Sequence, residues 1–152
     1  MTVRKRLVFI IPLLSIFVVL SDEWIKWFIL REFQGSSDKI TSIFSITIHK
    51  NFGLIFDIPF RMPIILFFSA IVGAALLHLA WKQAKERPEI GSAVALIIIG
   101  ALGNIYDRLV YGFTIDYLLF FKRSAINLSD LVILSGIVWL LLSARLSRFR
   151  YM

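Results

Sequence analysis

Residues Pro63–Trp81 read PIILFFSAIVGAALLHLAW, an apolar run that contains no Asp, Glu, Lys or Arg. A helix needs about 20 predominantly apolar residues to cross the hydrocarbon core of a bilayer, so this run predicts a membrane span. Within it, Ser69 and Gly73 lie four residues apart, a spacing of small residues that allows close packing by a neighbouring helix. The run Ile90–Tyr106 predicts a second span in the same way.

Two further apolar runs flank this pair, one near each end of the sequence. The first begins at Leu7 and, after the polar segment Ser21-Asp22-Glu23, resumes as far as Leu30. Basic residues precede it, as in a signal peptide, but no small-residue cleavage site follows, so we interpret it as a retained span. The four predicted spans cover residues 7–30, 63–81, 90–106 and 125–144.

The composition of the chain fits this interpretation. Apolar residues make up 59% of the 152 residues and charged residues only 18%, against about half and about a quarter in soluble domains. The length suits a single domain. The absence of cysteine excludes disulfides, thiolate metal sites and a cysteine nucleophile, and the two histidines lie far apart. We therefore expect neither a metal ion nor a cofactor.

The positive charges gather on one side of the predicted bundle. If the N-terminus is cytoplasmic, the segments on that side are residues 1–6, 82–89 and 145–152. They carry nine basic residues against two acidic ones, which accounts for the entire net charge of +7. This positive-inside pattern predicts that both termini face the cytoplasm. No basic face with interleaved aromatic residues lies outside the spans, so nucleic acid is not expected as a partner.

Residues 32–60, between the first two spans, have a different character. Apolar and polar residues alternate from Phe44 to His49, the period of a half-buried strand. Asn51-Phe52-Gly53 predicts a turn, and Leu54–Ile58 predicts a second short strand. The predicted fold class is therefore an all-α membrane protein, a four-transmembrane-helix bundle with a small extracytoplasmic β-cradle.

Four aspartates fall at the outer ends of spans or in the loop between the third and fourth spans: Asp22, Asp107, Asp116 and Asp130. An ionisable side chain at mid-bilayer costs about 2.5–3.5 kcal/mol on insertion scales, so each one requires a reason. We expect the four to converge at one depth. Asp22 and Lys26 are one helical turn apart and can pair, either to ease the insertion of both or to shape a site.

Two further groups of polar residues occupy the same predicted level. Asn104, Asp107 and Arg108 share one face at the end of the third span. We expect Asp107 and Arg108 to form a structural salt bridge rather than to take part in chemistry. Asn127 lies three residues before Asp130 at the start of the fourth span, where it is alternatively the N-cap of that helix.

Asp116 lies in an apolar stretch, residues 112–120, without an obvious cationic partner. Burial raises the pKa of such a carboxyl, and if Asp130 lies close the two share a proton. This pair is able to perform aspartic-protease chemistry, in which one carboxylate takes a proton from water while the other, protonated, donates toward the scissile carbonyl. A proton relay or a structural carboxyl gives the same spacing. No serine- or zinc-peptidase motif occurs in the chain.

Four elements of the sequence resemble the signature of the lipoprotein signal peptidases (signal peptidase II, or prolipoprotein signal peptidase). DEWIK, residues 22–26, resembles the D-x-x-x-K element of that family, and NFGLIF, residues 51–56, resembles its N-x-G-x-x-F element. GALGNIYDRL, residues 100–109, followed by Gly112 and the IDY of residues 115–117, is similar to its G-A-x-G-N-x-x-D-R-x…G…V-D-F block. AINLSD, residues 125–130, resembles F-N-x-A-D. The four occur in the family's order and cover nearly the whole chain.

This resemblance implies an aspartyl peptidase that cleaves prolipoproteins just before a diacylglyceryl-modified cysteine. The cleavage takes place in or near the outer leaflet of the bacterial cytoplasmic (inner) membrane, requires no metal, and is inhibited by cyclic peptides such as globomycin. By motif match, the catalytic residues are Asp116 and Asp130. The remaining matched residues would line and support the site, with the β element as a cradle over the substrate: Asp22, Lys26, Asn51, Gly53, Asn104, Asp107, Arg108 and Asn127.

The chain departs from the family pattern in a few places. Leu54 stands where the family usually has a small residue, and Asp57 follows the Phe of the same element, which affects the fit of the cradle over substrate. Ser129 stands where the family has Ala. The segment from Asp116 to Asp130 is shorter than expected but still leaves room for a turn that brings the two carboxyls together.

Two other functions fit an apolar bundle with buried acids. A small proton- or ion-translocating bundle would carry a relay of acids through the depth of the membrane. Here the inner halves of the spans are apolar, which disfavours a relay. A non-enzymatic assembly protein would use its polar pairs for stability alone.

Overall fold

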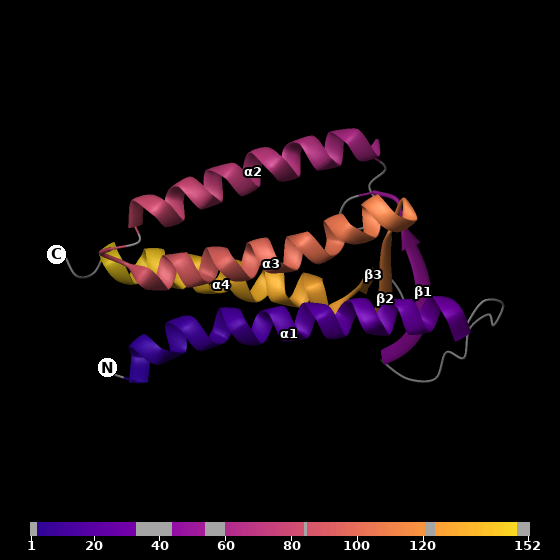
Figure 1. The fold of residues 1–152 in the computed structure, drawn as a ribbon, viewed down its shortest axis with the longest axis horizontal. Helices are drawn as coiled ribbons and strands as arrows, with labels where there is room; N and C mark the ends of the chain where they lie inside the picture. The colour runs from indigo at the N-terminus through magenta and orange to yellow at the C-terminus, as the bar shows by residue number, and fades with distance from the viewer. Residues whose placement is uncertain (1–2, 33–43, 54–59, 84, 121–123, 149–152) are drawn as a thin grey trace.

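The computed structural model describes residues 3–32, 44–53, 60–83, 85–120 and 124–148. Within these ranges lie four long helices: α1 (Val3–Glu32), α2 (Met62–Gln83), α3 (Pro88–Tyr111) and α4 (Leu128–Arg148). Each is long and apolar enough to cross a bilayer. Figure 1 shows that α1 begins and α4 ends at the same end of the bundle, with a small sheet at the opposite end. The predicted fold class is confirmed.

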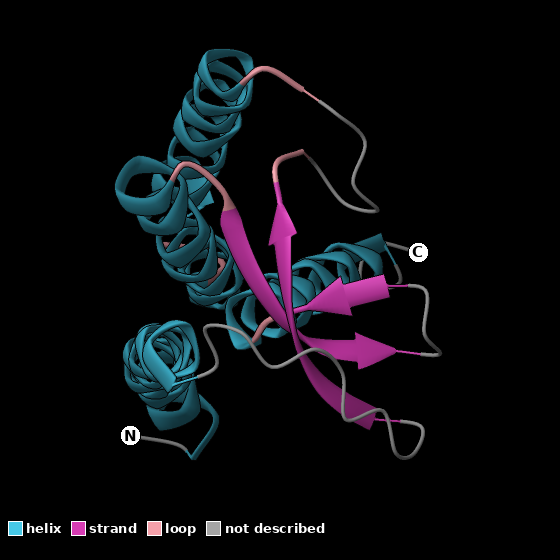
Figure 2. Cartoon of the chain, turned by 90° about the vertical axis from the view of Figure 1, so that its right-hand side faces the viewer, coloured by secondary structure: helices cyan, strands magenta, loops and turns pink. Residues whose placement is uncertain are grey.

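The third helix is the centre of the bundle. α3 contacts α1, α2 and α4, and the apolar core lies where Val19 of α1, Leu96 of α3 and Val132 of α4 meet. Among the helices, α2 makes substantial contacts with α3 alone. It stands apart from α1 and α4 in Figure 2. Most of its side chains are therefore exposed, as expected for a helix that faces lipid.

Glycines set the close approach of α3 to α4. A Cβ atom at Gly100 would lie 2.6 Å from the carbonyl oxygen of Ser129, and one at Gly136 would lie 2.8 Å from that of Ala93. Small residues at such crossings let helix backbones pack tightly in a membrane. The close packing expected from Ser69 and Gly73 is wrong for Gly73, because a Cβ there meets no atom within 4 Å.

The sheet joins two loops that are far apart in the sequence. It has three antiparallel strands in the order β1 (Phe44–Asn51), β2 (Thr114–Phe120) and β3 (Ser124–Ile126). β1 was predicted from its alternating pattern, and it pairs with β2 so that Asn51 lies opposite Thr114 and His49 opposite Asp116. The second predicted strand, Leu54–Ile58, lies outside the described residues.

The segment between the third and fourth helices corrects two of the sequence-based boundaries. α3 continues beyond Tyr106 to Tyr111, where Gly112 ends it with a left-handed backbone (φ 83°) and donates its N–H to the Arg108 carbonyl. The fourth helix starts at Leu128 rather than Ala125, because Ala125 belongs to β3 and pairs with Leu119. The described residues between Asp116 and the fourth helix therefore lie mainly in two paired antiparallel strands, β2 and β3.

The glycine contacts predict an effect on stability. Gly136→Val would force α3 and α4 apart, and overpacking of this kind costs about 1–3 kcal/mol. We expect the Tm of the purified protein in detergent to fall by several degrees. Gly73→Val on α2 is the matched control, since its Cβ has open space, and its Tm should remain close to that of the wild type. Equal Tm values for the two variants would contradict this packing.

Candidate active site

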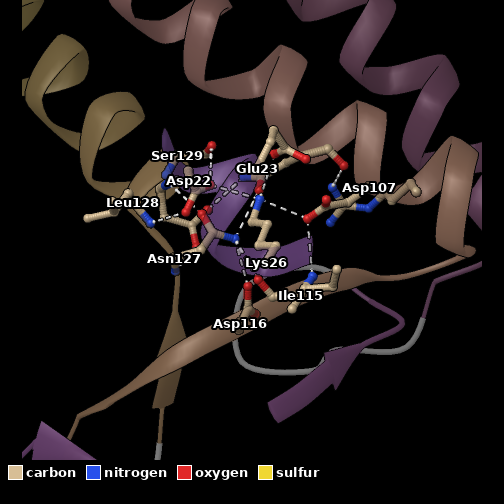
Figure 3. Close-up of polar contacts among 12 residues, drawn as sticks. Asp22, Glu23, Lys26, Asp107, Ile115, Asp116, Asn127, Leu128 and Ser129 are labelled. Carbon is tan, nitrogen blue, oxygen red and sulfur yellow. Dashed lines mark hydrogen bonds and ion pairs between the residues drawn. The ribbon is translucent and has the colours of Figure 1, made fainter. Parts of the chain in front are cut away.

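The polar residues singled out in the sequence come together at the sheet end of the bundle. Asp22 and Lys26 come from α1, Asn104, Asp107 and Arg108 from α3, Asp116 from β2, and Asp130 from α4. Figure 3 shows the centre of this cluster, with side chains from three helices and β2 pointing toward one another. The four aspartates that we expected to converge are linked by a continuous set of hydrogen bonds and ion pairs, described below.

Asn127 caps the fourth helix and binds Asp130 at the same time. Its side-chain Oδ1 accepts the backbone N–H of Asp130 at 2.9 Å, while its own backbone N–H donates to Asp130 Oδ2 at 3.2 Å. This reciprocal pair has the geometry of a capping box, and it explains why α4 begins at Leu128. The N-cap alternative for Asn127 is confirmed. The Asp130 carboxyl is held at the first turn of the helix as a result.

The amide group of Asn127 also connects the two candidate catalytic carboxyls. Its Nδ2 donates to Asp116 Oδ1 at 2.8 Å and to Asn104 Oδ1 at 3.0 Å. Asn104 in turn donates from its Nδ2 to Asp130 Oδ1 at 2.8 Å. Asp116 and Asp130 therefore both contact Asn127, one through its side chain and the other through its backbone. Their carboxyls belong to one hydrogen-bonded unit, with Asn127 between them.

The remaining oxygen of Asp116 is held from β1. Asn51 Nδ2 donates to Asp116 Oδ2 at 3.0 Å, and Asn51 Oδ1 accepts the N–H of Gly53 at 3.0 Å. Arg108 donates to the Gly53 carbonyl and to the Asn104 carbonyl, both at 3.1 Å. Asn51, Gly53 and Arg108 thus brace the end of β1 against α3.

Lys26 is fully buried and lies between three carboxylates. Its Nζ is 2.8 Å from Asp22 Oδ2, 2.8 Å from Asp107 Oδ2 and 3.0 Å from Glu23 Oε1. The predicted Asp22–Lys26 pair is confirmed. The predicted Asp107–Arg108 salt bridge is wrong, because Asp107 pairs with Lys26 and Arg108 binds backbone carbonyls. A buried ammonium ion is costly unless carboxylates neutralise it, and Lys26 of α1 therefore pairs with Asp107 of α3.

Three residues of this cluster were missed by sequence reasoning: Glu23, Tyr117 and Ser129. Glu23 has a signal in the sequence, since it lies three residues before Lys26 on the same helix. The hydroxyl groups of Tyr117 and Ser129 both donate to Asp22. Nothing in the spacing of those two residues relates them to Asp22, because they come from separate elements that only the fold brings together.

Burial and neighbouring charges set the ionisation of the groups that lie outside the spans. The pKa of Asp116 is raised to about 6, chiefly by burial and also by the negative charge of Asp130, while the hydrogen bonds from Asn51 and Asn127 and the nearby His49 lower it. Burial and the negative charge of Asp22 raise the pKa of the Tyr117 hydroxyl, which therefore remains a donor. Asp116 is thus able to hold a proton at a pH where an exposed aspartate is ionised.

The arrangement supports acid–base chemistry by a pair of carboxyls. A protonated carboxyl beside an ionised one supplies both a proton donor and a proton acceptor at one place. Among the parts of the chain that the structure describes, no group of three or more His, Cys, Asp or Glu side chains is arranged to hold a metal ion. The three carboxylates of Asp22, Glu23 and Asp107 are instead paired with the ammonium group of Lys26.

Comparison with known proteins agrees with the geometry. The family model described as "Signal peptidase (SPase) II" matches residues 14–146. A lipoprotein signal peptidase of Cupriavidus necator is 32% identical over 137 residues, which cover 84% of this chain and 78% of the relative. A lipoprotein signal peptidase of Halalkalibacterium halodurans is 28% identical over 132 residues, 82% of this chain and 85% of the relative.

The fold is also that of a solved bacterial membrane enzyme. That structure, determined by the in meso method, superposes with a TM-score of 0.76 at 25% sequence identity, over 87% of this chain and 85% of the other. A second bacterial membrane enzyme superposes with a TM-score of 0.74 at the same identity, over 87% and 90%. The family model, the relatives and the four apolar helices lead to one conclusion: this chain belongs to the signal peptidase II family and is a multi-pass membrane peptidase.

Proposed function

We propose that this protein removes signal peptides from prolipoproteins and cleaves just before a diacylglyceryl-modified cysteine. Family membership and the name shared by the relatives support the class of substrate. The residues that match the family's motifs gather in one cluster, which supports a single site for the reaction. The substrate carries an apolar signal helix and two acyl chains, so it would reach the site through the surrounding lipid.

Asp116 and Asp130 act as the catalytic pair in this proposal. The observation that carries it is the position of Asn127, which binds Asp116 Oδ1 through its side chain and Asp130 Oδ2 through its backbone N–H. Two carboxyls held by one residue lie close enough for the charge of one to raise the pKa of the other. Under these conditions the pair holds one proton, and the proton belongs to both members.

The reaction follows from that single proton. The ionised carboxylate takes a proton from a water molecule, whose oxygen attacks the carbonyl carbon of the scissile peptide bond. The protonated carboxyl donates its proton to the carbonyl oxygen, which gives a neutral tetrahedral intermediate. When the carbon–nitrogen bond breaks, the amine of the lipidated cysteine takes up the proton removed from the water, and the hydroxyl proton of the intermediate returns to the pair. The water thus supplies all atoms added to the products, and the pair regains its starting state.

The distribution of charge supports an orientation for this site. Basic residues outnumber acidic ones at and beside the helix ends opposite the sheet, so we propose that both termini are cytoplasmic and that the catalytic pair lies at the outer face of the bacterial inner membrane. Cyclic-peptide inhibitors such as globomycin would bind at the same site. Asp22, Asp107, Asp116 and Asp130 belong to one hydrogen-bonded cluster beside the sheet, an arrangement that favours a peptidase over a proton relay through the depth of the membrane.

Removal of either carboxylate tests the catalytic assignment. We expect Asp116→Asn and Asp130→Asn each to lower cleavage of a diacylglyceryl-modified prolipoprotein by at least about a thousandfold, because an amide neither accepts the proton from water nor donates one as an acid. The measurement is the cleavage rate of the purified full-length variants in lipid nanodiscs, together with their Tm.

A matched acid-to-amide change serves as the control. Glu86→Gln alters an exposed residue in the turn between α2 and α3, far from the cluster, and it should cleave at the wild-type rate. Cleavage at the control rate by either folded aspartate variant would refute the assignment of that residue.

The pH dependence of cleavage provides a second test. The raised pKa of Asp116 means that the pair loses its shared proton as the pH rises through about 6, so kcat/KM of the wild type should fall along an alkaline limb near that pH. The hydrogen bond from Asn51 favours the charged form of Asp116. Asn51→Ala should therefore move this limb to higher pH. A limb that stays in place or moves to lower pH would show that Asp116 does not govern it.

A further inference from the structure

Asp22 is the most heavily hydrogen-bonded carboxylate in the cluster, and it makes contacts beyond its ion pair with Lys26. Oδ1 accepts the Tyr117 hydroxyl at 2.6 Å and the N–H of Leu128 at 3.0 Å. Oδ2 accepts the Ser129 hydroxyl at 2.6 Å and the Ser129 N–H at 3.2 Å, in addition to Lys26. The three residues around Asp22 therefore come from β2 and from the first turn of α4. Figure 3 shows Asp22 beside Leu128 and Ser129.

The partners of Asp22 are the chain neighbours of the proposed catalytic pair. Tyr117 directly follows Asp116 in β2, and Ser129 directly precedes Asp130 in α4. Through Tyr117, Asp22 holds β2 at the residue next to Asp116. One buried carboxylate from a third element, α1, thus fixes the two segments that carry Asp116 and Asp130.

We propose that Tyr117 and Ser129 are positioning residues for cleavage, whose hydroxyl groups clamp β2 and α4 to the two oxygens of Asp22 and so fix the distance between Asp116 and Asp130. This inference rests on the proposed function, since it assigns a role in the reaction of that site. Neither residue touches the reacting atoms, and each acts through the aspartate next to it in the chain.

The hydrogen bonds from the Tyr117 and Ser129 hydroxyl groups to Asp22 are short and charge-assisted. An O–H group bound to a carboxylate at 2.5–2.7 Å forms a charge-assisted bond that is about twice as strong as a neutral one. Both hydroxyl contacts fall in this range, at 2.6 Å. Tyr117 and Ser129 are buried together with Asp22, so water does not compete for the bonds. The Ser129 hydroxyl also packs closely against Gly103, because a Cβ atom at Gly103 would lie 2.5 Å from Ser129 Oγ.

The two hydroxyl groups also mark where this chain departs from the pattern that it resembles. Tyr117 stands at the Phe of V-D-F and Ser129 at the Ala of F-N-x-A-D. Each departure adds one hydroxyl group to an otherwise similar side chain, and both of the added groups bind Asp22. The clamp would therefore be a property of this chain, and returning each residue to the pattern removes one hydroxyl without removing the side chain that fills the space.

The experiment compares Tyr117→Phe, Ser129→Ala and the double variant in the full-length protein. The measurements are kcat and KM at 25 °C for a diacylglyceryl-modified prolipoprotein peptide in nanodiscs, and the Tm of each variant. We expect each single change to lower kcat about tenfold, equivalent to about 1.4 kcal/mol in activation free energy, with KM within about twofold of the wild type. The double variant should lose less than the product of the two single losses, because the clamp is already broken once one segment is released.

Two substitutions with the same chemistry serve as controls. Tyr106→Phe removes the hydroxyl of an exposed tyrosine on α3, and Ser135→Ala removes a hydroxyl on α4 that binds only the Leu131 carbonyl of its own helix. Both should retain the kcat and KM of the wild type. If one of the two clamp variants does not yield folded protein, the other carries the same prediction, because its hydroxyl holds the opposite oxygen of Asp22.

The outcomes separate this inference from the proposed function. If the wild type cleaves the peptide and both clamp variants keep the kcat of the controls, with a lower Tm or without one, the hydroxyls contribute only to stability and the inference is overturned alone. A double variant that loses the full product of the single losses would also overturn it, since the two hydroxyls would then act separately. A wild-type protein that leaves the peptide intact would overturn the proposed function, and this inference with it.

Discussion

The ammonium group of Lys26 is fully buried in an apolar bundle, and the need to neutralise its charge determines how the sheet end of the molecule is arranged. A charge in such surroundings is costly unless carboxylates surround it closely. Asp22 and Glu23 are supplied by the same helix, whereas Asp107 comes from α3, so the ion pairs join α1 to the central helix. Without Lys26, three acids would meet with no positive charge among them.

Two of the three acids that neutralise Lys26 also bind backbone N–H groups of the elements that carry the proposed catalytic pair. Asp107 Oδ2 accepts the N–H of Ile115, the residue before Asp116, and Asp22 accepts the N–H groups at the start of α4, just before Asp130. Backbone donors at a helix N-terminus have no partner within the helix, and a carboxylate there satisfies them and matches the helix dipole. The charge cluster therefore also determines where β2 and α4 lie.

Much of this arrangement was predictable from the sequence, and the rest depended on contacts between distant segments. Long apolar runs such as residues 63–81 predict spans because the hydrocarbon core leaves few other structures available. The pair Asp22–Lys26 was predictable because it lies within one helical turn. The partner of β1 was not predictable from local patterning, since β2 follows a helix more than sixty residues later and is largely apolar. The same reason explains why Asp107 was assigned to Arg108, its neighbour in the chain, rather than to Lys26.

In the proposed mechanism, Asp116 and Asp130 share one proton because their charges act on each other. The most direct measurement is the titration of Asp116 by NMR of side-chain-labelled protein in nanodiscs, in the wild type and in Asp130→Asn. We expect the pKa of Asp116 to lie well above that of an exposed aspartate in the wild type and to fall when the negative charge of Asp130 is removed. An Asp116 pKa that is the same in both proteins would contradict the shared proton.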